Sequence, residues 1–239
     1  MGRMSLLREI QNDLVSEGGD VTAVLRKCKI LASRLGSDEF AQWVDGELNG
    51  YSPSQPTPPY RRLAIQYYAS FTNPVWQATR QPVPLQLVPK EHRGSFESIE
   101  FREGIAKADS FVRAGKGALI ERPELIFVLQ GKMYPRWIVR QLGPRFLLSN
   151  SSSLLAAVKS RVLDFVLKIE TENPNAGEAQ PNSQPVPTEK LRPLVQNVFY
   201  APVGNIAQNS DNLSQTANIG IQTETSPGSW RNSAIVSAN

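Results

Sequence analysis

The chain has 239 residues, of which 40% are hydrophobic and 20% charged, with 26 Lys and Arg against 22 Asp and Glu. These proportions are typical of a soluble globular protein with an ordinary core. The sequence contains no apolar run near the roughly 18 to 20 residues that cross a bilayer, and its first residues lack a signal-peptide core. We therefore expect a cytoplasmic protein without membrane contact.

Cysteine and histidine each occur once, as Cys28 and His92. A single cysteine excludes an internal disulfide, and the two residues supply too few ligands for a His/Cys zinc site. We expect no metal site and no cofactor. Because His92 lies among charged residues in a loop-like segment and Cys28 falls within an apolar helical stripe, neither indicates nucleophilic catalysis. The sequence therefore identifies no catalytic residue, and we favour a protein that is not an enzyme.

The N-terminal part of the chain predicts a helical unit. Apolar residues repeat at spacings of three and four from Leu6 to Val15, from Val21 to Leu35 and from Phe40 to Leu48. Asp20 and Ser37 stand directly before the second and third patterns, where an N-cap is favoured. Three short helices with short connections are therefore expected.

The middle of the chain predicts strands. Alternating apolar and polar residues from Leu63 to Phe71 indicate a strand. Val75-Trp76 and Val83 to Val88 are candidates for further strands, which neighbouring prolines confine to edges or loops. The apolar run from Leu125 to Leu129 is short enough for a buried strand, and Trp137 to Val139 fits either a strand or a helix.

Helical spacing returns twice later in the sequence. It runs from Ser98 to Val112, and again after Ser151 to about Asn173, where the longest helix is expected to be the central packing element. The predicted fold class is therefore α+β, with an N-terminal helical unit, a small mostly antiparallel sheet and a long C-terminal helix, followed by a linker and an Asn/Gln-rich tail.

Composition divides the chain into three parts. Residues 1–172 carry 23 basic and 18 acidic side chains and are expected to form the α+β body. Residues 173–196 are rich in Pro, Asn, Gln and Ser with few apolar side chains, so we predict a flexible linker. Residues 197–239 form the Asn/Gln-rich tail.

Four segments of the body together resemble a known family. They are SLLREIQN (Ser5 to Asn12), LRKCKILASRLGSDEFAQWVDGELNGY (Leu25 to Tyr51), Pro59-Tyr60-Arg61 and VKSRVLDFVLKIETENP (Val158 to Pro174). They resemble the AbiTii domain of bacterial abortive-infection proteins, over most of residues 5–174. The resemblance implies a role in defence against phage, in which an infected cell halts growth or dies before phage are released. It implies no particular catalytic residues, so the molecular mechanism stays open.

The tail contains two similar units, Val203 to Gln208 and Ala217 to Gln222, in which apolar residues stand among Asn, Gln and Gly. Such segments suit paired strands with Asn/Gln ladders when several copies stack. A disordered tail is the alternative interpretation. The tail is predicted to form a homo-oligomer or to dock a protein partner through Val203, Asn205, Ile206, Gln208, Asn218, Ile219 and Ile221.

Basic residues concentrate between residues 113 and 145, where seven cations accompany two acids. Tyr134, Trp137 and Phe146 interleave with them, and cations beside aromatic rings suit the binding of phosphates and bases. Trp137 and Phe146 fit a core position equally well. Nucleic acid is therefore a hypothetical partner for Arg113, Lys116, Lys132, Arg136, Arg140 and Arg145.

A magnesium-dependent nuclease is the alternative activity. Asp109, Glu124 and Gln130-Gly131-Lys132 follow the order of acids and lysine in a restriction-type nuclease, although such spacing arises readily by chance. The leading hypothesis is a defence protein whose body binds another macromolecule and whose tail assembles copies or docks a partner. Its rival is a toxic nuclease or nucleic-acid binder.

Overall fold

The first three helices lie where the sequence predicts them. In the computed structural model, which describes residues 4–16, 18–115 and 118–202, they are α1 (Leu6–Val15), α2 (Val21–Leu35) and α3 (Asp38–Asn49). Each is N-capped by a side-chain oxygen that accepts a backbone N–H, from Ser5, Asp20 and Ser37 respectively. The helix α2 ends at Gly36, whose φ of 62° is readily adopted by a residue without a Cβ.

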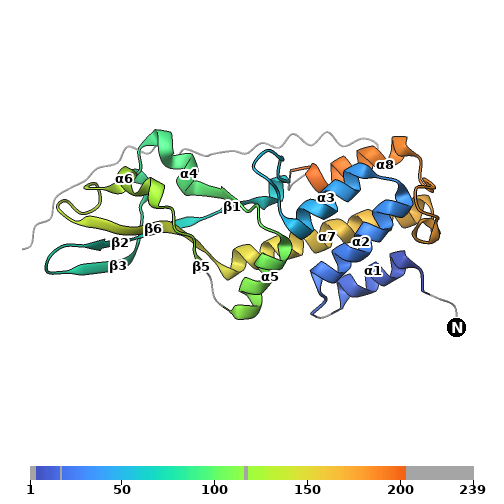
Figure 1. Cartoon of the computed structure of the whole chain (residues 1–239), viewed down its shortest axis with the longest axis horizontal. Coiled ribbons are helices and arrows are strands. Elements are labelled where there is room, and N and C mark those ends of the chain that lie inside the picture. Colours follow the sequence, from blue (N-terminus) through green and yellow to red (C-terminus); the bar gives the residue numbers. More distant parts are fainter. Residues whose placement is uncertain (1–3, 17, 116–117, 203–239) are drawn as a thin grey trace, which may run out of the picture. The chain divides into compact units, whose positions relative to one another are not determined.

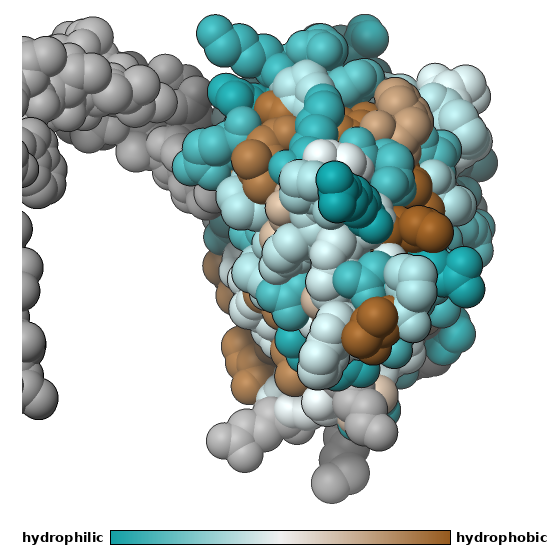
Figure 2. All heavy atoms as spheres, turned by 90° about the vertical axis from the view of Figure 1, so that its left-hand side faces the viewer, coloured by the Kyte–Doolittle hydropathy of each residue, from teal (hydrophilic) through white to brown (hydrophobic). Residues whose placement is uncertain are grey.

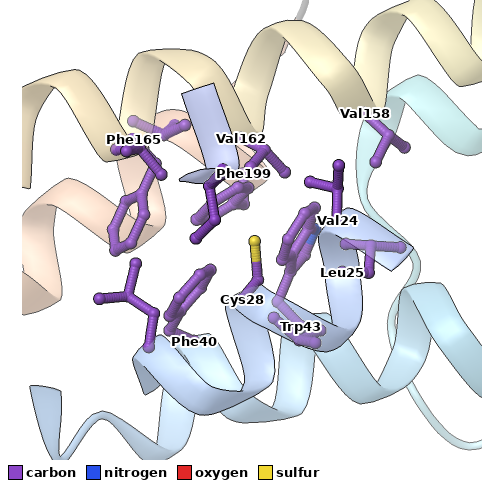
Figure 3. Packing of buried hydrophobic residues seen from close by; sticks show 14 of the residues in the cluster. Val24, Leu25, Cys28, Phe40, Trp43, Val158, Val162, Phe165 and Phe199 are labelled. Atoms are coloured by element: carbon purple, nitrogen blue, oxygen red, sulfur yellow. The ribbon is translucent and has the colours of Figure 1, made fainter. Parts of the chain in front are cut away.

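The long helix α7 (Leu148–Glu172) packs against α1, α2 and α5 (Ile105–Ala114). Its buried face begins at Leu154 and continues through Val158, Val162 and Phe165, as expected from the sequence. Figure 3 shows these side chains facing Cys28 of α2 and aromatic rings of α3. Each fully buried aliphatic or aromatic side chain contributes about 1.5–3 kcal/mol, so α7 is the central packing element of the first core.

Residues 173–202 pack along this helical core, and we call them the C-terminal strap. They contain η5 (Ala176–Glu178), α8 (Thr188–Val195) and the π-helical turn η6 (Gln196–Tyr200). The arrangement differs from the flexible linker predicted over residues 173–196. The composition there is indeed polar, but its few apolar side chains are spaced so that each reaches the core: Ala176, Val186, Leu191, Val195, Val198 and Phe199.

Antiparallel pairing confirms the predicted α+β class. A small sheet joins β1 (Arg62–Ala64) to β4 (Ser98–Glu100). A larger sheet has the order β3 (Gln77–Pro82), β2 (Gln66–Thr72), β6 (Ile138–Phe146) and β5 (Ala118–Leu119), with every pair antiparallel.

One face of the larger sheet forms a second core. Tyr67, Ala69 and Phe71 of β2 pack there against Phe96 and Leu129, which belong to α4 (Arg93–Glu97) and α6 (Ile126–Leu129). Figure 1 shows both helices on the same side of the sheet. The contacts therefore leave these two helices on one face, which we call the covered face.

Several predicted elements differ from the structure. The run from Leu125 to Leu129 forms the 3-10 turn η4 (Pro123–Leu125) and α6 instead of a strand, because both edges of the neighbouring β6 are already occupied by β2 and β5. Residues 83–88 contain only η2 (Leu85–Leu87), flanked by proline. The helix expected from Ser98 begins only at Ile105, since residues 98–100 pair as β4. A further 3-10 turn, η3 (Lys90–His92), precedes α4, and η1 (Pro59–Arg61) precedes β1. No helix in the described part of the chain combines the length and apolarity needed to cross a bilayer.

Candidate functional site

The second face of the larger sheet, which we call the open sheet face, carries polar and basic side chains. Residues paired across antiparallel strands point to the same face. Gln66 pairs with Arg145, Tyr68 with Gly143, Ser70 with Gln141 and Thr72 with Ile138, and these residues alternate with those of the covered face. The side chains of Gln66, Gln141, Arg145 and Ile138 are exposed to solvent.

Two irregularities in the pairing place further arginines beside the central strand. Between Ser70 and Phe71 the register with β6 shifts, which leaves Arg140 as an additional, exposed residue. On the other side of β2, Arg80 has a φ of 52° and its backbone N–H donates to Ser70 Oγ at 3.3 Å. Arg80 and Arg140 therefore flank the same point of β2, and neighbouring strands lie about 4.8 Å apart.

Acidic side chains are scarce around this surface. Residues 73–81 and 130–141 contain Arg80, Lys132, Arg136 and Arg140 but no Asp or Glu. Glu121 lies beside the open sheet face, where its Oε1 accepts a hydrogen bond from the Gln141 amide. Ion pairs among the described residues engage none of the four cations or Arg145. The surface is therefore basic, and its cations remain available to an anionic ligand.

The structure brings together some of the residues predicted to contact nucleic acid. Arg140 and Arg145 lie on β6, and Lys132 and Arg136 lie in the exposed segment that leads into it. Arg113 lies apart, in the last turn of α5, and is paired with Asp109 at 2.6 Å. Lys116 lies outside the described residues, as do the tail residues predicted for self-association: Val203, Asn205, Ile206, Gln208, Asn218, Ile219 and Ile221.

The aromatic residues proposed from the sequence are not those exposed on this surface. Phe146 is fully buried in the first core, and Tyr134 packs edge-on against Phe71 with ring centroids 4.8 Å apart. Trp137 is partly buried beside Tyr134. Sequence reasoning missed Tyr68 and Trp76. The alternation of apolar and polar residues along residues 63–71 already placed Tyr68 on the face opposite to Tyr67, so this residue had a usable signal.

The acids of the nuclease hypothesis are each held by an arginine. Asp109 pairs with Arg113, and Glu124 pairs with Arg122, which lowers the pKa of the Glu124 carboxyl through their hydrogen bond. The Gln130 amide donates to the Trp137 carbonyl at 2.8 Å and accepts the Val139 N–H at 3.1 Å. Gln130 therefore has a structural role at the start of β6. Within residues 4–16, 18–115 and 118–202, no three His, Cys, Asp or Glu side chains cluster as a metal site would require.

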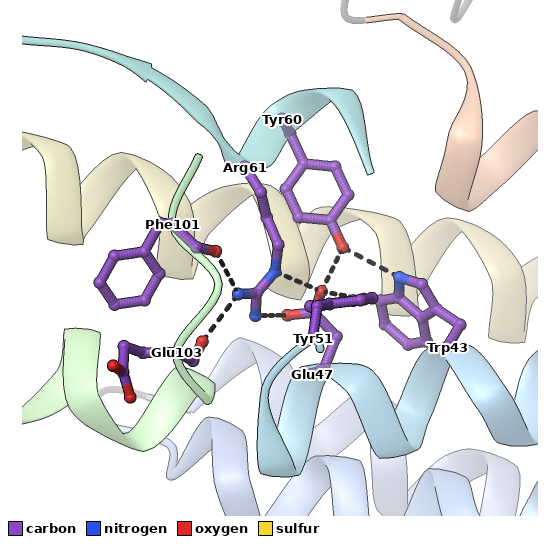
Figure 4. A network of polar contacts seen from close by, with 7 residues as sticks. All are labelled: Trp43, Glu47, Tyr51, Tyr60, Arg61, Phe101 and Glu103. Carbon is purple, nitrogen blue, oxygen red and sulfur yellow. Dashed lines mark hydrogen bonds and ion pairs between the residues drawn. The ribbon is translucent and has the colours of Figure 1, made fainter. Parts of the chain in front are cut away.

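A second polar cluster lies inside the helical part of the molecule (Figure 4). Glu47 of α3 accepts hydrogen bonds from Arg61 Nε and Nη2 at 2.8 and 2.7 Å, and from the hydroxyls of Tyr51 and Tyr60 at 2.9 and 2.7 Å. Arg61 Nη1 donates to the carbonyls of Phe101 and Glu103, both at 2.8 Å. Burial, followed by the negative charge of Glu47, raises the pKa of Tyr51 and of Tyr60, which keeps both hydroxyls as donors.

This cluster, which we call the Glu47 network, is structural. The side chains of Glu47 and Arg61 have no solvent exposure, so a substrate cannot reach them. Their residues lie in the segments DGELNGY and Pro59-Tyr60-Arg61, which the resemblance singled out. Cys28 is likewise fully buried, and burial raises the pKa of its thiol, as expected of a core residue. His92 lies in η3 and meets the exposed Phe127 edge-on.

The fold and its surfaces define a small α+β protein with a basic open sheet and a buried ionic network. Comparison with family models gives a match to AbiTii over residues 5–192. The chain belongs to the AbiTii family, which associates it with abortive infection, a bacterial defence against phage. The match includes the C-terminal strap as far as α8, which agrees with the packing of this segment on the core. Neither the search of curated proteins nor the search of solved structures found a match.

Proposed function

We propose that this AbiTii protein acts in defence by binding nucleic acid on the open sheet face. The observation that carries the proposal is the row of cations on adjacent strands without neighbouring acids: Arg80 on β3, and Arg140 and Arg145 on β6. Lys and Arg side chains that neutralise phosphates release condensed counterions, and this release drives binding.

The spacing of the cations supports an extended polyanion as the ligand. Arg140 and Arg145 lie five residues apart on one strand, and a strand rises about 3.3 Å per residue, so their Cα atoms are separated by roughly 15 Å. A small anion such as free phosphate does not span this distance, whereas a nucleic-acid backbone presents charges along its whole length. The amides of Gln66, Gln77 and Gln141 supply hydrogen-bond donors and acceptors between the charges.

A binding titration with charge-reversal variants tests the proposal. A labelled oligonucleotide is titrated with the full-length protein and with Arg140→Glu/Arg145→Glu over a series of salt concentrations. We expect the double variant to bind at least tenfold more weakly. The slope of log affinity against log salt should fall by about two, because two phosphate contacts are lost.

The control must change the net charge equally at another place. Arg8 and Lys168 are exposed on α1 and α7, so Arg8→Glu/Lys168→Glu provides this control. The proposal is overturned if the wild-type protein binds no nucleic acid at low salt, or if both double variants lose affinity to the same extent. In phage-infected cells, the loss of protection should follow the sheet variant and not the control.

A further inference from the structure

Trp76 is the most conspicuous exposed aromatic residue near the open sheet face. It lies in the turn between β2 and β3, and 70% of its surface is accessible to solvent. A tryptophan ring is a large apolar surface that a soluble protein normally covers, so such exposure at a basic surface points to a ligand.

The turn that carries Trp76 is held by hydrogen bonds. Asn73 Oδ1 accepts the backbone N–H groups of Val75 and Trp76 at 2.9 and 2.6 Å, and the Asn73 N–H donates to the Trp76 carbonyl at 2.9 Å. An Asn side chain that accepts backbone N–H groups two and three residues ahead stabilises a tight turn. The position of the ring is therefore limited to its own side-chain rotations, and binding orders few additional groups.

The pairing places this ring at the basic end of the sheet. Trp76 precedes Gln77, which pairs with Thr72, and Thr72 pairs on its other side with Ile138. Arg80 and Arg140 flank β2 at Ser70, two residues further along, which corresponds to about 7 Å. Tyr68 follows at the next position on the same face, opposite Gly143, which has no side chain to stand across from the ring.

Figure 2 looks onto this end of the sheet, where hydrophobic residues appear as separate patches among hydrophilic ones. Contiguous apolar patches mark protein or membrane interfaces, whereas separate rings among cations suit bases that stack one at a time. The arrangement of Trp76, Tyr68 and the neighbouring arginines therefore favours a ligand that offers both flat rings and negative charges.

We propose that Trp76 stacks on an unpaired base, so that the open sheet face takes single-stranded nucleic acid in preference to duplex. This inference rests on the proposed function, because it concerns the same surface. Bases within a duplex are stacked on one another and present only their edges in the grooves. A single strand can turn a base onto an aromatic ring while the arginines contact its phosphates.

The test compares single-stranded and duplex oligonucleotides of the same sequence with wild type, Trp76→Ala and Trp76→Phe. Base stacking on an aromatic ring corresponds to roughly a five- to hundredfold effect on affinity. We expect Trp76→Ala to lose this factor for the single strand and to bind the duplex within about twofold of wild type. Trp76→Phe should recover most of the loss, since phenylalanine also provides a flat ring.

The outcomes separate the two proposals. If no oligonucleotide binds, or if charge reversal on β6 has no specific effect, the proposed function fails. If the arginines matter but Trp76→Ala weakens single strand and duplex equally, or neither, only the stacking inference fails. Vesicles of anionic lipid serve as a further probe. Tight binding to them that depends on Trp76, without binding to oligonucleotides, would overturn the inference in favour of a membrane surface.

Discussion

Arg61 and Glu47 form a two-pronged ion pair with no exposure of either side chain, and its two contacts measure 2.8 and 2.7 Å. The pair links α3, which carries Glu47, to η1, which carries Arg61. Arg61 also binds two carbonyls in the segment between β4 and α5. The Glu47 network therefore joins the N-terminal helices to the beginning of the β region, which positions the open sheet relative to the helical core.

Removing the charge of Glu47 should destabilise the protein strongly. In Glu47→Gln the buried Arg61 loses its counterion, and breaking a buried pair in this way costs about 3–5 kcal/mol. Chemical denaturation monitored by tryptophan fluorescence measures the change in the free energy of unfolding. The matched control is Asp45→Asn, which removes an exposed ion pair with Lys29 and should cost less than about 1 kcal/mol. Equal losses in the two variants would contradict the structural role of the network.

Local signals explain why the helical part could be predicted from the sequence. The first three helices are bounded by residues whose effect is local: a capping side chain such as Asp20 at the start and Gly36 at the end. Their apolar spacing then matches the buried residues. The strap could not be recognised from composition, because its order depends on where single side chains such as Val186 and Phe199 meet a groove formed by distant helices.

The candidate surface depended on information that a sequence does not carry. The concentration of cations between residues 113 and 145 was visible, but their direction was not, since the register between β2 and β6 contains a bulge at Arg140. Arg113 lies in an α-helix and pairs locally. Arg80 and Trp76 come from a hairpin some 60 residues earlier in the chain, and only strand pairing brings them beside Arg140.

Stability should fall in alkaline solution because of the buried tyrosines. Burial raises the pKa of Tyr51 and Tyr60 above the ordinary value near 10. Below about pH 10 the hydroxyls are neutral in both folded and unfolded chains, so their contribution is fully present. Above it the unfolded chain ionises first, and the free energy of unfolding decreases as pH rises.

The measurement is the free energy of unfolding of wild type, Tyr51→Phe and Tyr60→Phe between neutral pH and pH values above 10. Each variant should be less stable at neutral pH, because a hydrogen bond to Glu47 is lost, and should show a shallower alkaline decrease. Cys28→Ala is included because the buried thiol, whose pKa is also raised by burial, adds to the same trend. An alkaline decrease as steep in both tyrosine variants as in wild type would assign the titration to other groups.

The strap should be part of the cooperative fold. Phe199 is fully buried, and its ring lies 3.9 Å from that of Trp43 between centroids. Truncation of such a side chain typically costs about 3–5 kcal/mol, so Phe199→Ala should lower the free energy of unfolding by this amount. Phe127→Ala is the control, because Phe127 is 67% exposed and its loss should cost less than about 0.5 kcal/mol. Similar values for the two variants would indicate that the strap is detached in solution.

The position of the strap also determines how the predicted self-association of the tail can be tested. A deletion from residue 174 would remove buried residues such as Ala176 and Val195 and would damage the core, whereas a deletion of residues 203–239 leaves them in place. We expect the shorter deletion to keep the stability of the body and to reduce the mass in solution from a multiple of 26.5 kDa to that of one truncated chain. Light scattering gives the mass, and denaturation confirms that the body is intact.

Substitution within the full chain separates the sequence of the tail from its length. Ile206→Lys/Ile219→Lys places charges within the two similar units, and like charges in stacked copies repel one another. This variant should therefore dissociate as the deletion does. A control with the same added charge, Ser214→Lys/Ser233→Lys, changes positions outside the two units and should retain the assembly. If the full chain, the deletion and both double variants each have the mass of one chain, the tail does not drive self-association.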